Sequence, residues 1–194
     1  MQCTKCRNPA ITELKHLEPL CKRCFCEVIE KRIRKYTRLN KSFRRGDRIL
    51  ITDKITEFIA TRIIFDLPIK FFTEEFSLEE IQNPSKKLLE FISENKISKI
   101  VVPWTADDEA CSFLHLVFNN NIETDFSSGI SHKIIKILST VTNKETELYS
   151  EINRMEFTSN TFYPDVRKFL DSLEEIYPDT KFGIAKSREI YMRK

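Results

Sequence analysis

The segment 99–120 constrains the fold of this chain more than any other part of the sequence. A short β-branched run at its start predicts a strand, and apolar residues at helical spacing after position 105 predict a helix. Thr105 can cap this helix, because Asp108 stands three residues later and completes a capping box. A strand, a turn and a helix in this order form the repeating unit of an α/β sheet, so the sequence predicts the α/β class.

Three acidic residues occupy the first turn of that helix, namely Asp107, Asp108 and Glu109. The helix dipole favours carboxylates at an N-terminus, and this structural explanation needs no ligand. The tetrapeptide 107–110 after a hydrophobic strand also resembles the Ala-Asp-Asp-Glu-Ala segment of the PP-loop ATPases that attach sulfur or nitrogen to RNA bases. In that family the segment follows Gly-His-Asn and helps to hold the adenylate, whereas Pro-Trp-Thr precedes it here.

Four of the six cysteines form two Cys-x-x-Cys pairs, Cys3 with Cys6 and Cys21 with Cys24. Fourteen residues separate the pairs, which is typical of a zinc ribbon in which four thiolates surround one Zn²⁺. The doubling of the motif argues against a redox function. Because four protein ligands close the coordination sphere, the sequence predicts a structural zinc with no open position for catalysis. His16 lies between the pairs, but four sulfurs already satisfy the metal, so we expect it at the surface.

Positive charge is concentrated in the first quarter of the chain. Residues 1–48 contain 14 Lys or Arg against 5 Asp or Glu, whereas the rest contains 18 against 24. The segment 25–39 has helical periodicity with a basic outward side. Such a run can be a merely solvated helix face, but beside a zinc ribbon it also predicts a nucleic-acid surface. The candidate tRNA-binding residues are Lys31, Arg32, Arg34, Lys35, Arg38, Lys41, Arg44 and Arg45.

The order of these features resembles the opening of the tRNA 2-thiolation family, the thiouridine-forming branch of the PP-loop ATPases. The resemblance rests on Cys3-x-x-Cys6, Ala10, the run 20–25 and the basic helix after it, with the Asp-Asp-Glu-Ala segment downstream. It covers most of the chain and implies that the zinc module and the basic helix contact tRNA. The implied fold is an N-terminal four-cysteine zinc ribbon followed by a reduced PP-loop α/β/α domain with a parallel sheet.

The pyrophosphate loop of that family is not matched here. Residues 48–51 predict the first strand and 57–65 the helix after it, so the loop is 52–56, Thr-Asp-Lys-Ile-Thr. The family has Ser-Gly-Gly-x-Asp-Ser at this place, since glycines let backbone N–H groups close around the phosphates of ATP. This loop contains no glycine and adds an aspartate, so ATP is not an expected cofactor. A vestigial nucleotide site is expected at Thr52, Asp53, Lys54, Asp107 and Asp108.

The cysteines that hold an iron–sulfur cluster in the catalytic relatives have no counterpart either. Those relatives carry a Cys-x-x-Cys pair and a third cysteine beyond the phosphate loop. This sequence has no cysteine between Cys26 and Cys111, and none follows Cys111. We expect Cys111 in the core, and only Lys22 and Arg23 lie near Cys26 as groups that could activate it. The resemblance therefore implies no iron–sulfur cluster and no catalytic residue.

The chain is expected to have three parts, a zinc ribbon at 1–26, a basic helix and linker at 27–47, and the degenerate PP-loop-like α/β domain at 48–194. The strands of the sheet are expected near 48–52, 69–72, 98–102 and 133–138. Further helices are expected at 84–94, with Asn83 as cap and Pro84 as first residue, at 142–149 and at 164–177. The sequence has no signal peptide and no apolar run of membrane-spanning length, so we expect a cytoplasmic protein.

Three functions are open from the sequence. The first is a non-catalytic tRNA-binding member of the thiolation family, paired with an active homologue or with itself and acting in wobble or other 2-thiouridine formation. The second is a divergent ATP-dependent tRNA sulfurtransferase, for which Lys54, Asp107, Asp108 and Cys111 are the only candidates. The third is a zinc-ribbon regulator that binds nucleic acid without changing any tRNA base. The combined loss of three catalytic motifs favours the first.

Overall fold

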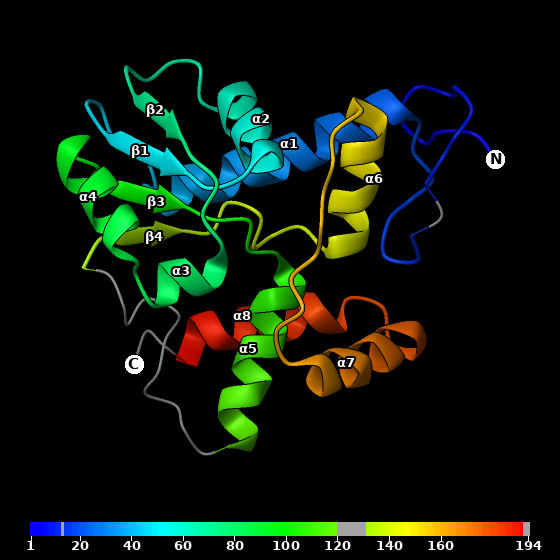
Figure 1. Cartoon of the computed structure of the whole chain (residues 1–194). Coiled ribbons are helices and arrows are strands. Elements are labelled where there is room, and N and C mark those ends of the chain that lie inside the picture. Colours follow the sequence, from blue (N-terminus) through cyan, green and yellow to red (C-terminus); the bar gives the residue numbers. More distant parts are fainter. Residues whose placement is uncertain (13, 120–130, 192–194) are drawn as a thin grey trace.

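The computed structural model describes residues 1–12, 14–119 and 131–191 (Figure 1). A four-stranded sheet lies at its centre, in the order β2-β1-β3-β4. The strands are β1 Arg48–Ile51, β2 Lys70–Thr73, β3 Lys99–Val101 and β4 Lys133–Ile135. All three strand pairs are parallel, and Leu50 of β1 is in register with both Phe72 and Ile100. The predicted α/β class with a parallel sheet is confirmed.

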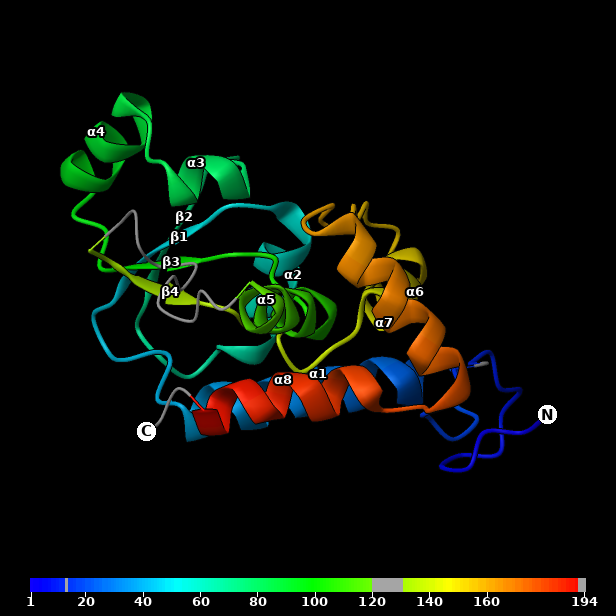
Figure 2. The ribbon, with the colours of Figure 1, turned by 90° about the horizontal axis from the view of Figure 1, so that it is seen from below.

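Helices cover both faces of the sheet (Figure 2). One face carries α1 Lys22–Leu39, α2 Lys54–Ile63 and α6 Asn143–Asn153. The other face carries α3 Leu78–Gln82 and α4 Lys86–Glu94. Successive side chains of a strand point to opposite faces, so Ile49 and Ile51 pack with the first group and Leu50 packs with the second. Both faces of β1 are therefore buried, as its unbroken apolar sequence requires.

Helix α1 combines a buried stripe with a cationic outer side. Phe25, Ile29 and Ile33 recur every four residues, share one helix face and are fully buried against the sheet. Each such side chain stabilises the fold by about 1.5–3 kcal/mol on burial. The predicted helix 25–39 is confirmed, although it begins at Lys22, within the second cysteine pair. The cationic side is thus displayed by a helix that belongs to the core.

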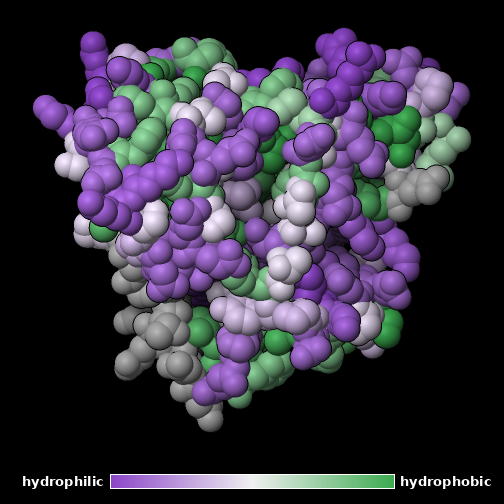
Figure 3. All heavy atoms as spheres, in the orientation of Figure 1, coloured by the Kyte–Doolittle hydropathy of each residue, from purple (hydrophilic) through white to green (hydrophobic). Residues whose placement is uncertain are grey.

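A second group of helices leads away from the sheet (Figure 1). It consists of α5 Ala106–Phe118, α7 Pro164–Ile176 and α8 Thr180–Tyr191. Ala110 and Cys111 of α5 pack with Leu170 of α7, whereas Val117 and Phe118, farther along the same helix, are exposed. Among the described residues, α7 and α8 are the helices that pack against α5. Figure 3 shows hydrophobic residues at this lower end of the molecule.

The helix starts follow local capping, with two corrections. The capping box predicted at Thr105 is confirmed, and Thr142 forms another at the start of the predicted helix 142–149. Helix α4 is capped by Ser85 and not by Asn83, since Asn83 ends the additional helix α3. Helix α2 begins three residues before the predicted start because Asp53 caps it.

The last residue of the segment 99–120 lies outside the described residues. In the part of the chain that is described, no helix is both long and apolar enough to cross a membrane.

Candidate functional site

The four cysteines of the two pairs come together near the N-terminus. Their Sγ atoms all lie within 4.8 Å of one another, and those of Cys6 and Cys21 are 3.4 Å apart. Zn–S bonds near 2.3 Å in a tetrahedral site place the sulfurs roughly 3.8 Å apart, so this set fits a single metal ion. An iron–sulfur cluster binds its cysteines through several irons and holds their sulfurs farther apart. The four thiolates could therefore hold one tetrahedral ion, with no ligand position left for a substrate.

Local turns bring the sulfurs into this geometry. The backbone N–H of Cys3 donates to the carbonyl of Asn8 at 2.8 Å, and that of Arg7, at φ +62°, donates to the carbonyl of Cys3 at 3.0 Å. Cys21 is the N-cap of α1, so Cys24 lies in the first turn of that helix. Burial acts to raise the pKa of Cys3, but hydrogen bonds from surrounding backbone amides outweigh it and lower the pKa to about 6. A thiol that ionises so readily is suited to bind a metal.

A buried glutamate ties the segment between the cysteine pairs to the body of the protein. Glu145, in the first turn of α6, lies 3.1 Å from Nε2 of His16 and accepts two hydrogen bonds of 2.9 Å from Arg32. Burial acts to raise the pKa of Glu145, yet His16 and Arg32 outweigh it and the pKa is lowered. The expectation that His16 lies at the surface was wrong, since its side chain is only 9% exposed. The charge of Arg32, a candidate tRNA-binding residue, is likewise largely neutralised inside the protein by its pairing with Glu145.

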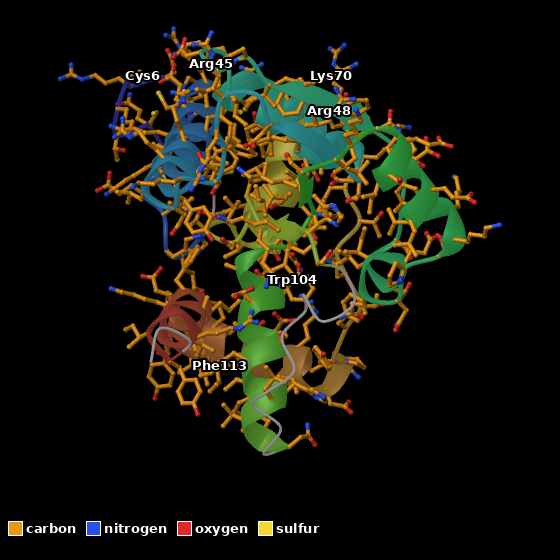
Figure 4. All side chains as sticks on the ribbon, turned by 90° about the vertical axis from the view of Figure 1, so that its left-hand side faces the viewer. Cys6, Arg45, Arg48, Lys70, Trp104 and Phe113 are labelled. Carbon is orange, nitrogen blue, oxygen red and sulfur yellow. The ribbon has the colours of Figure 1, made fainter. Side chains whose placement is uncertain are left out.

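The other candidate tRNA-binding residues are exposed. They are Lys31, Arg34, Lys35, Arg38, Lys41, Arg44 and Arg45. Figure 4 views the molecule from the amino ends of the strands, where Arg45 lies on the same margin as Arg48 and Lys70. Sequence reasoning missed Lys70, and it counted Arg48 in the basic run but not among the candidate tRNA-binding residues. Both are first residues of strands, and both lie over the ring of Phe72, at 4.8 and 4.9 Å from its centroid.

A pocket of about 380 Å³ lies at the opposite end of the sheet, beyond the carboxyl ends of β1 and β2. Open α/β sheets commonly bind their ligands at this end. The charged groups among its described lining residues are the carboxylates of Asp53, Glu75 and Glu156 and the ammonium of Lys54. Lys54 Nζ lies 3.4 Å from a Glu75 carboxylate oxygen. We call this the strand-end pocket; its surplus of negative charge opposes the binding of phosphates.

Asp53 closes the helix N-terminus that would face those phosphates. Its Oδ1 accepts a hydrogen bond of 2.8 Å from the backbone N–H of Thr56 and so caps α2. Its Oδ2 is buried without a hydrogen-bond partner among the described residues, and burial raises the pKa of this carboxyl. In a glycine-rich loop, backbone N–H groups at a helix N-terminus bind a phosphate. Here the carboxylate of Asp53 accepts a hydrogen bond from such an N–H group instead.

Asp107, the first acid of α5, is bound from two sides. Its Oδ1 accepts from Lys181 Nζ of α8 at 2.5 Å, and its Oδ2 accepts from the backbone N–H of Asn143 at 2.9 Å. Lys181 is buried and lies 2.6 Å from Asp171 as well. The carboxylate of Asp107 therefore joins α5 to both α6 and α8.

Asp108 and Glu109 are occupied in the same way. Asp108 accepts from Arg167 of α7 at 2.7 Å and from Asn160 at 2.9 Å, in addition to capping α5. Burial raises the pKa of Asp108, although Arg167 and the hydrogen bonds act against this. Glu109 pairs with Arg188 of α8. This geometry agrees with the structural explanation of acids at a helix N-terminus.

The two cysteines outside the metal set are not activated. Burial raises the pKa of Cys111 to about 12. Burial also raises the pKa of Cys26, although Asn153 donates to its sulfur at 3.7 Å. Because the thiolate is the nucleophile, neither cysteine is suited to carry sulfur at neutral pH. The sequence contains no other cysteine that could do so.

Known proteins similar to this chain include a sulfurtransferase and a thiolase, although no protein-family model matches it. Over 52 residues the chain is 46% identical to the tRNA-5-methyluridine(54) 2-sulfurtransferase of Thermotoga maritima, and this match covers 26% of the chain and only 17% of that protein. The structure is similar to the U34-tRNA thiolase NcsA of Methanococcus maripaludis, which was solved with its 4Fe-4S cluster. The TM-score is 0.75 at 15% identity, over 100% of this chain and 87% of that one. The fold is therefore that of a tRNA thiolase, as the sequence predicted.

Proposed function

We propose that this chain is a non-catalytic, tRNA-binding member of the tRNA 2-thiolation family. The local sequence likeness to a sulfurtransferase and the fold of a thiolase support the relationship. The observation that carries the loss of catalysis is Asp53, whose carboxylate caps α2 where the family binds the phosphates of ATP. A helix N-terminus that is already capped, beside a pocket rich in carboxylates, disfavours a nucleotide.

The proposal assigns one zinc ion to Cys3, Cys6, Cys21 and Cys24, in a structural role. The close approach of the four sulfurs supports a single ion. Because the similar thiolase carries a 4Fe-4S cluster, iron is the alternative occupant to be tested. Metal analysis and a visible absorption spectrum of the protein purified without air distinguish the two occupants. Zinc is colourless, whereas an iron–sulfur cluster absorbs visible light.

We propose an active homologue as the partner of this chain. The proposal that sulfur transfer occurs on another chain is supported by the raised pKa values of both thiols outside the metal set and by a phosphate loop without glycine. We propose that this protein presents tRNA to such a homologue. A second copy of this chain would supply neither missing part.

The test is recovery of the tagged full-length protein from its native cells, followed by mass spectrometry and RNA sequencing. We expect a homologue with an intact phosphate loop together with tRNA, and a decrease of 2-thiouridine in the deletion strain. Recovery of RNA with unchanged 2-thiouridine would instead favour a nucleic-acid-binding regulator.

The second candidate is a divergent ATP-dependent sulfurtransferase, and the 46% identical segment favours it. It predicts saturable binding of ATP that depends on Lys54 or Asp107. Binding of Mg-ATP in calorimetry, together with recovery of neither homologue nor tRNA, would replace our proposal by this one.

A further inference from the structure

A groove of about 430 Å³ opens between the second half of α1 and the connection from α2 to β2. Four exposed cations line its α1 side, namely Arg34, Arg38, Lys41 and Arg44. The carboxylate among its described lining residues is that of Asp66. We call it the amino-end groove, because it lies beside the starts of β1 and β2. Its charge is opposite in sign to that of the strand-end pocket.

The facing wall of the groove is apolar and open. Phe65 is 69% exposed, and the neighbouring Leu67 is also exposed. The guanidinium of Arg34 lies 5.6 Å from the centroid of the Phe65 ring, and Arg34 also donates to the carbonyl of Arg62 at 3.5 Å. A single exposed apolar residue needs no explanation, but an aromatic ring among four cations forms a platform on which a planar ligand can stack.

Both walls are fixed before anything binds. The N–H of Gly46 donates to the carbonyl of Pro68 at 3.0 Å and joins the loop after α1 to the connection before β2. Lys99, in β3, donates to the carbonyl of Ser42 at 2.8 Å and pairs with Asp47 at 2.5 Å. These contacts anchor the cationic loop to the sheet, so little conformational freedom has to be lost on binding.

We infer that the amino-end groove binds an unstacked nucleotide of tRNA, with its base on Phe65 and the flanking phosphates at Arg38, Lys41 and Arg44. The inference rests on the proposed tRNA binding and deepens it. Exposed aromatic rings beside cations are the pattern by which proteins bind single-stranded nucleic acid. An acidic protein segment would use the cations but leave the open ring without a stacking partner, and a duplex keeps its bases stacked on one another.

The first experiment measures tRNA affinity by fluorescence anisotropy with full-length, metal-loaded protein. Phe65→Ala is expected to weaken binding about 5- to 150-fold, as the loss of one stacked base does. Phe65→Tyr keeps the ring and is expected to retain the affinity. Tyr177→Ala is the matched control, since this aromatic residue is 64% exposed at the end of α7, outside the groove.

The second experiment reports stacking itself. The native chain contains one tryptophan, Trp104, which is buried, so Phe65→Trp adds a distinct exposed fluorophore. We expect tRNA and a single-stranded oligonucleotide to quench it, and a blunt duplex to leave it unchanged. Arg38→Gln is expected to weaken binding of all RNAs alike and to reduce the slope of log affinity against log salt by about 1.

The outcomes separate the inference from the proposed function. If the wild type binds tRNA and the Phe65→Ala variant binds it equally well, the groove is not the nucleotide site, while the proposed function stands. If the wild type does not bind tRNA at all, both are overturned. Quenching of the Phe65→Trp variant by an acidic peptide as strong as that by RNA would assign the groove to a protein partner. Because Phe65 is exposed, circular dichroism is expected to show an unchanged fold for these variants.

Discussion

The two ends of the sheet carry opposite charge, although they share the same four strands. Cations gather at the amino ends, around the amino-end groove, and carboxylates line the strand-end pocket. Strand β1 alone shows the contrast, because it begins with Arg48 and leads directly into Thr52 and Asp53. Folds of this class usually bind nucleotides at the carboxyl end. The difference teaches that the two ends of one sheet can carry opposite charge, and that here the amino end is the one suited to a polyanion.

The largest expected effect concerns the four-cysteine cluster, because Cys21 is the N-cap of α1 and Cys24 lies in its first turn. Structural zinc sites contribute roughly 10–16 kcal/mol of apparent binding free energy at neutral pH. Removal of the metal by a chelator should therefore lower the melting temperature and weaken tRNA binding. Cys6→Ser should lose the metal, whereas Cys111→Ser, a buried cysteine outside the set, should retain it. An unchanged melting temperature after metal removal would contradict this dependence.

The next effect compares a buried ion pair with an exposed one at the carboxyl end of the sheet. Lys181→Met leaves Asp107 buried without its cation, and breaking a buried pair in this way costs about 3–5 kcal/mol of unfolding free energy. Lys54→Met removes the partner of Glu75 in the strand-end pocket, where both side chains are more than 70% exposed, at 74% and 73%. Such a pair contributes about 0–1 kcal/mol. Equal losses of stability in urea unfolding would remove this distinction.

The pH dependence of two variants should have opposite sign. Burial raises the pKa of Asp53, so the wild type loses stability as the pH rises through that pKa. Asp53→Asn should therefore be more stable than the wild type at pH 7, and the gain should vanish in acid. The pKa of Glu145 is lowered, so its contribution is present above its ordinary value and is lost as the pH falls through the lowered one. Glu145→Gln should be less stable at pH 7 and approach the wild type in acid.

The measurement is thermal unfolding of both variants and the wild type between pH 3 and 8, with pH values chosen around the ordinary carboxyl range. A difference from the wild type that stays constant over this range would mean that neither charge state matters to the fold. Loss of stability by Asp53→Asn at pH 7 would show that favourable interactions of the charged Asp53 carboxylate outweigh the cost of its burial.

The smallest effect compares single charges at the two ends. Arg45→Gln at the amino end should weaken tRNA binding and reduce the salt slope by about 1. Glu156→Gln in the strand-end pocket should leave both unchanged or slightly improve binding, since it only removes a distant repulsion. Filter binding over a series of salt concentrations checks this. A larger loss of tRNA affinity from Glu156→Gln than from Arg45→Gln would place the RNA at the carboxyl end of the sheet and contradict this prediction.

Local signals in the sequence were sufficient for much of the fold. The cysteine spacing predicted the four-thiolate cluster, and capping residues predicted the starts of α5 and α6. The sequence could not reveal that Asp107 and Asp108 meet Lys181 and Arg167, because these pairs form only when distant helices pack. That Asp107 and Asp108 belong to a vestigial nucleotide site stays a prediction. Their ion pairs give both residues a structural role.

The amino-end groove could not be derived from the sequence for the same reason. Its cations were predicted as an outward helix face, but Phe65 lies far along the chain, at the end of the segment read as a helix. Only the packing of α1 against α2 brings the ring to the cations. Periodicity predicts which face of a helix is exposed, whereas the neighbour across a groove depends on the tertiary arrangement.

Hydrogen–deuterium exchange of the full-length, metal-loaded protein tests the contrast between the two ends most directly, because a single experiment reports on both. We predict that tRNA slows exchange in residues 38–46 and 63–68, around the amino-end groove. We also predict that Mg-ATP changes nothing in 52–56 or 105–109. Protection of 52–56 and 105–109 by Mg-ATP, without protection of the groove by tRNA, would contradict the account and return the carboxyl end of the sheet to the position of an active site.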